Sequence, residues 1–300
     1  MSQLPILVSG ASGQVGQRVI EFLLGQETGP IIATTRTPEN HKTVSHRNLH
    51  LRKADLDDRR GLPGAFKGAK RLLLISTNSV DVPGRRIIQH RNAIEAANEA
   101  GVEHIVYTSF LEPLGHGLSL LTADHVATES LIKESGLGYT VLRNSFYPEM
   151  LTRMLAGVGS DGCISAASGN GQVAYVTRED CARAAGAALL DTFCGKRVLD
   201  ITGPTLIGAE DVAKIASSAL GKEIATMYVS GEELESRMIS SGIPARLAAL
   251  LAQMECCVAR GVMEIQSDDI RSLVGHPATS PAEFISSYLR GLCAKAAQPS

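Results

Sequence analysis

Short apolar runs alternate with longer segments of helical period through the first 150 residues. Several runs are apolar at consecutive positions, which is typical of strands covered on both faces of a parallel sheet. The segments between them repeat apolar residues on one helical face. The pattern predicts strands at 6–9, 31–35, 49–54, 71–77, 104–109 and 139–144, and helices at 15–24, 85–100 and 122–136. Thr122 is expected to cap the last helix, and Gly101 and Gly136 to stop the second and third.

The repetition of strand, helix and strand predicts an α/β fold of the Rossmann type, with a doubly wound parallel sheet. The rhythm changes after residue 150. Residues 159–172 are rich in Gly and Ser and are predicted to be loop around short strand pieces. A helix at 178–191 and a strand at 196–203 still fit the sheet, whereas the pattern from 209 onward is mainly helical.

This change of pattern predicts two parts. We expect a Rossmann domain over 1–150, to which residues 173–203 return. Residues 151–172 and 204–300 are expected to form a smaller, mostly helical substrate lobe. In such folds the ligand lies in the crevice at the carboxyl ends of the strands.

Composition and charge narrow the possible partners. The chain has 300 residues, of which 44% are hydrophobic and 20% charged, as in a soluble globular protein. A net charge of -2 argues against nucleic acid or an anionic membrane as partner. No apolar run approaches the roughly 20 residues that span a bilayer, and no signal-peptide pattern opens the chain. We expect a cytoplasmic protein.

The cysteines do not form a metal-binding pattern. None belongs to a C-x-x-C pair, and no His cluster with zinc-ligand spacing accompanies them. The six are Cys163, Cys181, Cys194, Cys256, Cys257 and Cys293. We expect small buried thiols in a reducing compartment and no structural metal.

A glycine-rich stretch, "GASGQVG", lies between the first predicted strand and the first predicted helix. At such a junction the main chain can touch a pyrophosphate, and the first helical N–H groups point at that anion. Gly10 would make the tight turn, Gly13 would permit close approach, and Gly16 would let helix and strand pack. The simpler alternative is a sharp connection alone. The position favours a dinucleotide site, with predicted contacts from Gly10, Ser12, Gly13, Gln14, Val15 and Gly16.

The end of the second strand selects the cofactor. An acidic residue about 20 positions past the glycines would accept the ribose hydroxyls of NAD, whereas an Arg accommodates a 2′-phosphate. The sequence "IIATTRTPEN" places Arg36 there, with no acid before Glu39. Because a guanidinium fork suits a phosphate, we predict NADP(H), the alternative being an ordinary solvated Arg.

Further strand ends are expected to complete the cofactor site. Asp55 and Leu56 would flank the adenine. Ser76, Thr77 and Asn78 would lie along the nicotinamide half. These assignments follow from the order of the strands, and surface turns of the same composition are common.

The Gly-x-x-Gly-x-x-Gly spacing resembles the extended and atypical branches of the short-chain dehydrogenase/reductase superfamily. Members of that superfamily commonly use Ser, Tyr and Lys, with Tyr-x-x-x-Lys on the helix after the fifth strand. Here Ser109 ends that strand, but the helix carries "HVATE", with His125 and Glu129 where Tyr and Lys would be sought. His125 could assist proton transfer or could simply be half-buried and hydrogen-bonded. Without an acid dyad, an easily reduced acceptor is favoured, or no chemistry at all.

The chain as a whole resembles the NmrA-like branch of the atypical short-chain reductases. Within it the chain is most similar to the second bacterial type of NADPH-dependent quinone oxidoreductase and to triphenylmethane reductase. The resemblance rests on "TRTP", "QHRNAIEAANEAGVEHIVYTS", "ADHVATE", "YTVLRNSFYPE", "SGNGQVAYVTREDCA" and "GHPATSPAE". That family lacks the Tyr–Lys pair. It reads "NGW" where this chain reads "NSF", which changes the shape of the acceptor site.

The resemblance implies roles for several residues. Arg36 would contact the 2′-phosphate. Asn144, Phe146 and Tyr147 would line the nicotinamide and acceptor site, and Tyr175 would border it. The alternative for Phe146 and Tyr147 is packing at a domain seam. Ser109 and Asn144 complete the set of predicted cofactor contacts.

The function expected from the sequence is an NADPH-dependent oxidoreductase that transfers a hydride to a small quinone-like or conjugated acceptor. Two alternatives stay open: an NADP-binding, redox-sensing regulator without turnover, and a reductase for an imine or enone in secondary metabolism. A homodimer is possible.

Overall fold

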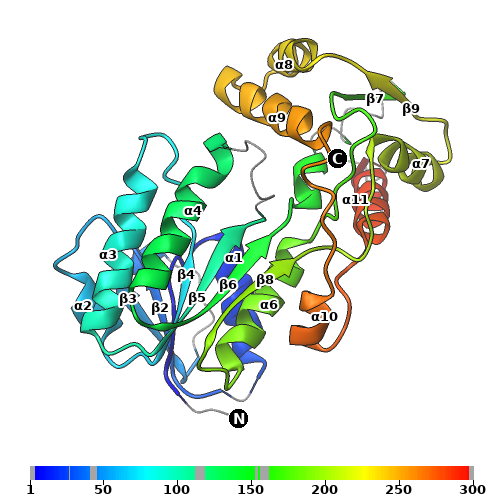
Figure 1. The fold of residues 1–300 in the computed structure, drawn as a ribbon. Coiled ribbons are helices and arrows are strands. Elements are labelled where there is room, and N and C mark those ends of the chain that lie inside the picture. Colours follow the sequence, from blue (N-terminus) through cyan, green and yellow to red (C-terminus); the bar gives the residue numbers. More distant parts are fainter. Residues whose placement is uncertain are drawn as a thin grey trace.

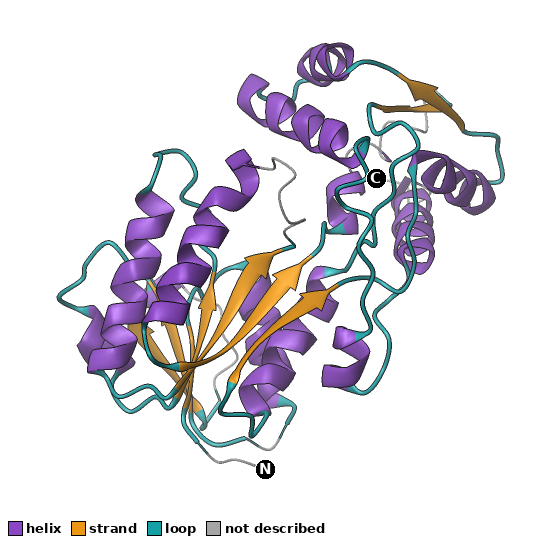
Figure 2. Ribbon diagram, viewed as in Figure 1, coloured by secondary structure: helices purple, strands orange, loops and turns teal. Residues whose placement is uncertain are grey.

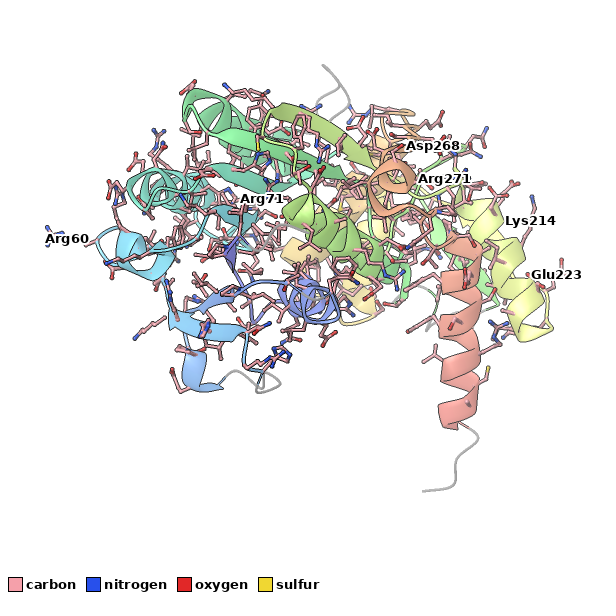
Figure 3. All side chains as sticks on the ribbon, turned by 90° about the horizontal axis from the view of Figure 1, so that it is seen from below. Arg60, Arg71, Lys214, Glu223, Asp268 and Arg271 are labelled. Atoms are coloured by element: carbon pink, nitrogen blue, oxygen red, sulfur yellow. The ribbon has the colours of Figure 1, made fainter. Side chains whose placement is uncertain are left out.

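The protein folds around one large parallel sheet, with most of the C-terminal helices gathered at one end of it (Figure 1). The computed structural model describes residues 4–26, 28–40, 46–111, 119–152, 155 and 162–296. Arg60 and Lys214 lie on opposite sides of the molecule, one beside the sheet and one on the C-terminal helices (Figure 3).

The sheet has seven strands in the order β3-β2-β1-β4-β5-β6-β8, and all neighbours are parallel. The strand order reverses between β1 and β4, which is the switch point where ligands bind in this topology. The strands are β1 (Ile6–Val8), β2 (Ile31–Thr35), β3 (Leu49–Lys53), β4 (Arg71–Ile75), β5 (His104–Phe110), β6 (Gly138–Asn144) and β8 (Lys196–Ile201). The Rossmann-type prediction is confirmed.

Helices cover both faces of the sheet, as Figure 2 shows. On one face α1 (Gln14–Leu24) and α6 (Arg178–Leu190) pack together and enclose a core with Val19, Leu23 and Val106. On the other face the core includes Phe66, Ile94 and Tyr107. The helices there are α2 (Leu62–Phe66), α3 (Arg85–Glu99) and α4 (Ser119–Glu134). Coverage of both faces explains why the strands are apolar at consecutive positions.

The C-terminal region builds a second set of cores beside the sheet. Strands β7 (Cys163–Ala166) and β9 (Ala225–Tyr228) form a separate parallel pair. The helices are α7 (Ala209–Leu220), α8 (Gly231–Ser240), α9 (Ala245–Val258), α10 (Asp269–Val274) and α11 (Pro281–Ala296). Helix α10 packs on α6 and β8, so this short helix lies against the Rossmann part.

Most predicted elements are present, and the corrections concern details. Gly101 and Gly136 have positive φ just beyond α3 and α4, as their stop role requires. Thr122 does not cap α4, because the helix begins at Ser119 and Thr122 lies inside it. Residues 159–161 of the predicted loop lie outside the described residues. Within the described part of the chain, no helix is both long enough and apolar enough to cross a membrane.

Candidate functional site: a glycine turn and the carboxyl ends of the strands

The glycine-rich turn lies directly between β1 and α1. Gly10 has a φ of 65°, which disfavours a side chain, and Gly13 precedes the first residue of α1. A Cβ atom on Gly16 would lie 2.3 Å from the carbonyl oxygen of Gly10, so the turn closes only with glycine there. These positions match the expected tight turn and close helix–strand packing.

The start of α1 is open to a ligand. Gly13 provides no side-chain cap, and the first turn of the helix contains no acidic residue. Ser12, Gly13 and Gln14 are exposed. The free N–H groups and the helix dipole at this end favour an anion.

Arg36 follows β2 at the same edge of the sheet as the glycine turn. The Ala11 N–H donates to the Thr34 carbonyl over 3.0 Å, and the Thr35 hydroxyl donates to Ser12 Oγ over 3.2 Å. These two bonds hold the end of β2 against the turn. Arg36 is exposed beside it, so its guanidinium is accessible.

The loop after β3 carries a polar cluster that includes residues the sequence did not indicate. Asp55 is half-buried, and its Oδ1 accepts the Asp57 N–H over 3.0 Å. Asp57 pairs with Arg85 over 2.6 Å and accepts from Gln89 over 3.1 Å. The bond from Arg85 holds the pKa of Asp57 below its usual value, and Arg36 adds a smaller electrostatic contribution in the same direction. Arg36 is therefore near this loop.

The carbonyl of Leu56, in the same loop, accepts a hydrogen bond from the Asn92 amide over 2.8 Å, so α3 fixes this backbone. The sequence drew attention to Asp55 and Leu56 because they end a strand. It gave no signal for Asp57, because its partners lie on α3, roughly 30 residues further along the chain.

Hydrogen bonds from its backbone N–H groups to side chains of neighbouring elements hold the segment after β4 in place. The Ser76 N–H donates to Thr108 Oγ1 over 2.9 Å, and the Thr77 N–H donates to His90 Nε2 over 3.1 Å. The Thr77 Oγ1 is buried and has no hydrogen-bond partner among the described residues. Asn78 is exposed. An unsatisfied buried hydroxyl at a strand end is a place for a ligand to bond.

The end of β6 repeats this feature. The Asn144 amide approaches the Tyr147 hydroxyl at 3.5 Å, while Asn144 Oδ1 is buried without a partner in the described chain. The neighbouring Ser145 Oγ is unpartnered in the same way. Sequence reasoning selected Asn144 but not Ser145 as a contact residue.

Ser109 is occupied within the protein. Its hydroxyl donates to Glu129 Oε1 over 2.8 Å. Arg143 donates two hydrogen bonds, of 3.0 and 2.8 Å, to the same carboxylate. Although burial opposes it, the bonds from Arg143 and Ser109 hold the pKa of Glu129 below its usual value. Glu129 is thus a paired carboxylate on α4, and this arrangement does not favour Ser109 as a cofactor contact.

His125 lies in a buried hydrogen-bonded group behind the strand ends. Its Nδ1 is 2.9 Å from the Tyr107 hydroxyl, and its Nε2 is 3.5 Å from Arg86 Nη1. Burial lowers its pKa to about 3, so the imidazole is neutral at pH 7. Since Arg86 can only donate, the ring proton is assigned to Nδ1 and points to Tyr107. The structure favours the hydrogen-bonded alternative over the proton donor.

The predicted acceptor residues occupy different surroundings. Phe146 is 5% exposed, and its ring lies 5.3 Å from the ring of Phe110. Tyr147 is half-buried beneath Arg178, whose guanidinium lies 4.7 Å from the ring centre. Burial raises the pKa of the Tyr147 hydroxyl. Phe146 packs with Met254 and Met263 at the seam with the C-terminal helices, and little of its ring is exposed.

Tyr175 packs against the same apolar cluster as Phe110 and Phe146, and the next residue, Val176, donates its N–H to the Phe146 carbonyl over 3.0 Å. Tyr175 also lines a cavity of about 20 Å³ together with Glu255 and the start of α7. Burial raises the pKa of both Tyr175 and Glu255. The cavity has room for about one water molecule, so it is too small for an acceptor ring.

A family model described as NAD(P)H-binding matches residues 10–192 of the chain, from the glycine turn through α6. The chain belongs to the NAD(P)H-binding family. Quinone oxidoreductase 2 of Escherichia coli (strain K12) is 33% identical over 94% of this chain and 97% of its own length. An NmrA-like family domain-containing oxidoreductase of Aspergillus flavus is 28% identical over 76% of this chain and 75% of its own.

Solved structures agree with these relatives. The NADPH-dependent quinone oxidoreductase of Escherichia coli, in complex with NADPH, matches with a TM-score of 0.86 and 32% identity, over 94% of this chain and 99% of that one. Triphenylmethane reductase of Citrobacter sp., in complex with NADP(H), matches with a TM-score of 0.88 and 31% identity over the same shares. The family membership and this near full-length similarity identify the chain as an NAD(P)H-dependent oxidoreductase of the quinone reductase type.

Proposed function

We propose that this protein transfers a hydride from NADPH to a quinone-like or otherwise conjugated acceptor, which lies above the carboxyl ends of β5 and β6. The observation that carries the proposal is the contrast between the two halves of the site. The cofactor side is open and has unsatisfied donors and acceptors. The reacting side has no tyrosine–lysine acid pair on α4.

The residues present fit NADP(H). The turn at Gly10 and the uncapped start of α1 suit the pyrophosphate. Arg36 suits the 2′-phosphate, because a guanidinium binds phosphate through a bidentate fork. Thr77 Oγ1 and Asn144 Oδ1 are buried atoms that a nicotinamide group would satisfy. NADP(H) is also the cofactor in the similar quinone oxidoreductase and triphenylmethane reductase structures.

NADPH supplies the hydride when bound, and the residues of the chain position it and the acceptor. The turn fixes the pyrophosphate end. The segment around Thr77, held by His90, fixes the backbone along the nicotinamide half. Phe110, which is partly exposed and packs on the buried Phe146, offers an apolar surface, while Tyr147 lies under Arg178 in a different apolar cluster.

The protonation states of His125 and Ser109 favour an acceptor that can delocalise the negative charge it gains on reduction. His125 is neutral at pH 7, and the Ser109 hydroxyl is bonded to Glu129. An unactivated ketone would become a strongly basic alkoxide and would require a strong acid. A quinone or another conjugated acceptor delocalises the charge, so positioning alone can support the reaction.

The direct test is oxidation of NADPH by the purified protein with a panel of acceptors. We expect turnover with benzoquinones and naphthoquinones, and none with unactivated cyclic ketones. The loss of NADPH absorbance measures it. Tight binding of NADPH without turnover of any acceptor would contradict the proposal and would support an NADP-binding regulator instead.

A further inference from the structure

We propose that the guanidinium of Arg86 binds the acceptor oxygen that becomes negative on reduction, and thereby selects carbonyl acceptors over cationic dyes. This inference rests on the proposed function and names the acceptor chemistry of the same site. Arg86 is the second residue of α3 and follows the loop that leaves β4. No motif in the sequence singled it out.

The side chain of Arg86 is mostly enclosed by the protein, and its donors are incompletely bonded. Only 12% of it is exposed. Its Nη1 has one long contact, 3.5 Å to His125 Nε2, and its Nε has no hydrogen-bond partner among the described residues. The Asp124 carboxylate lies 4.0 Å from Nε. A buried cation is costly unless it is hydrogen-bonded and paired, so these donors favour an additional acceptor atom.

A second buried arginine, whose Nε also has no partner among the described residues, shows that this chain can satisfy the terminal nitrogens of such a group. Arg71, at the start of β4, is 4% exposed and is labelled in Figure 3. Its Nη1 donates to the Phe193 carbonyl over 3.1 Å, and its Nη2 donates to the Ala188 carbonyl over 3.0 Å. Arg71 therefore binds carbonyls at the C-terminal end of α6 and stabilises the fold. Arg86 has no comparable pair of bonds in the described part of the chain.

Few charged groups surround Arg86. Burial lowers the pKa values of His90 and His125 to about 3, so neither histidine carries a charge at pH 7. The Thr77 N–H donates to His90 Nε2, and Thr128 lies 2.8 Å from His90 Nδ1. Thr128 in turn donates to the Asp124 carbonyl over 2.7 Å. These bonds fix the His90 ring. Asp124 is the one carboxylate within 4.0 Å of Arg86 in the described chain.

A row of rings connects Arg86 to the predicted acceptor position. The His125 ring, which touches Arg86, lies 6.2 Å from the ring of Phe110. Phe110 lies 5.3 Å from Phe146. Phe110 ends β5, and Phe146 lies two residues beyond β6. An aromatic acceptor against Phe110 would therefore lie next to the His125 ring, which Arg86 contacts.

The charge balance of the reaction gives this position a role. A quinone that receives a hydride, two electrons and one proton, becomes a hydroquinone monoanion, while NADPH becomes NADP⁺. The anion then takes one proton from water. Arg86 stays protonated throughout and stabilises the negative oxygen. A cationic triphenylmethane dye becomes neutral on the same transfer, so a fixed cation gives no such stabilisation and disfavours its binding.

The test compares Arg86→Gln, Arg86→Lys and a control, Arg91→Gln, which removes an exposed charge from the same helix. In Arg86→Gln we expect kcat/KM for a naphthoquinone to fall about 100-fold, the typical loss for one oxyanion donor. Arg86→Lys should recover part of it, and the control should match wild type. The kcat/KM for a cationic triphenylmethane dye should stay level or rise.

A binding measurement separates this inference from the proposed function. Calorimetry with 2-naphthoate, an anion that cannot be reduced, should show weaker binding to Arg86→Gln and unchanged binding to Arg91→Gln. The NADPH affinity and melting temperature should be retained in Arg86→Lys. Equal losses with quinone and dye, or unchanged naphthoate binding, would overturn the role of Arg86. A wild-type protein that binds naphthoate through Arg86 but reduces no quinone would overturn the proposed function alone.

Discussion

Arg36 is the residue on which, in our proposal, the choice of cofactor depends. It is exposed beside the glycine turn and near the loop that carries Asp57. Replacing Arg36 with Ala should weaken NADPH binding roughly 10- to 100-fold, since a charge-assisted hydrogen bond contributes about 1.5–3 kcal/mol. NADH binding should change little. Titration with both dinucleotides measures this, with Arg290→Ala on α11 as the exposed control. Equal losses for NADPH and NADH would refute the 2′-phosphate role.

Gly16 tests the turn itself. An added Cβ would lie 2.3 Å from the Gly10 carbonyl oxygen, which is backbone and cannot move cheaply. Gly16→Ala should therefore cost about 1–3 kcal/mol of unfolding free energy and weaken NADPH binding. Gly64→Ala on α2 is the matched control, because its Cβ would meet nothing within 4 Å. Denaturant titration decides between them, and a Gly16→Ala protein as stable as the control would be inconsistent with this packing.

At the level of single elements, Thr177 ties α6 to the C-terminal segment. Its Oγ1 accepts the Asp180 N–H over 3.0 Å and donates to Asp180 Oδ2 over 2.7 Å. The same oxygen of Asp180 accepts the Thr279 N–H over 2.9 Å. Thr177→Ala should lower the free energy of unfolding by about 1–2 kcal/mol, the usual loss for an N-cap, whereas Thr177→Ser should keep most of it. Identical urea midpoints for the two variants would exclude this cap.

The elements that could be predicted from sequence are those with a strong periodic pattern. Buried parallel strands such as β2 and β4 show continuous apolar runs, because helices cover both of their faces. Strand β9 was not predicted, because most of its residues are exposed and its pattern carries no burial signal. The start of α4 was misplaced because Thr122, a common cap residue, is buried inside the helix.

The residues of the candidate site also fall into those that could be predicted from the sequence and those that could not. The positions of the glycine turn and of Arg36 could be predicted, because each directly follows a strand, whereas their roles toward a cofactor stay predictions. Arg86 and Asp57 could not, because their partners, His125 on α4 and Gln89 on α3, are roughly 30 to 40 residues away. Tyr175, selected from a family motif, packs against the cluster of Phe110 and Phe146 and also lines the small cavity with Glu255, so its role at the acceptor site stays a prediction.

For the whole molecule, three buried histidines predict sensitivity to acid. Burial lowers the pKa values of His90 and His125 to about 3 and that of His104 to about 4. The unfolded chain therefore binds these protons first, below pH 6.5. The contribution of these neutral, buried histidines to the free energy of unfolding is complete above pH 6.5. It is lost as the pH falls toward the pKa values that the histidines have in the folded protein. Each histidine should cost about 1.4 kcal/mol per pH unit across this window.

Denaturant titrations between pH 6.5 and pH 5 check this slope. His104→Gln should be less stable at pH 7, because its bond to Thr140 is lost, yet its free energy of unfolding should fall less steeply with acid. A variant with the wild-type slope would show that His104 does not carry the effect.

The most direct test of the whole account is calorimetric titration of the purified protein with NADPH and, separately, with NADH. The account predicts one NADPH bound per chain, with clearly higher affinity than NADH, because the glycine turn accepts the pyrophosphate and Arg36 the 2′-phosphate. No heat of binding with NADPH, or an equal affinity for both dinucleotides, would contradict it.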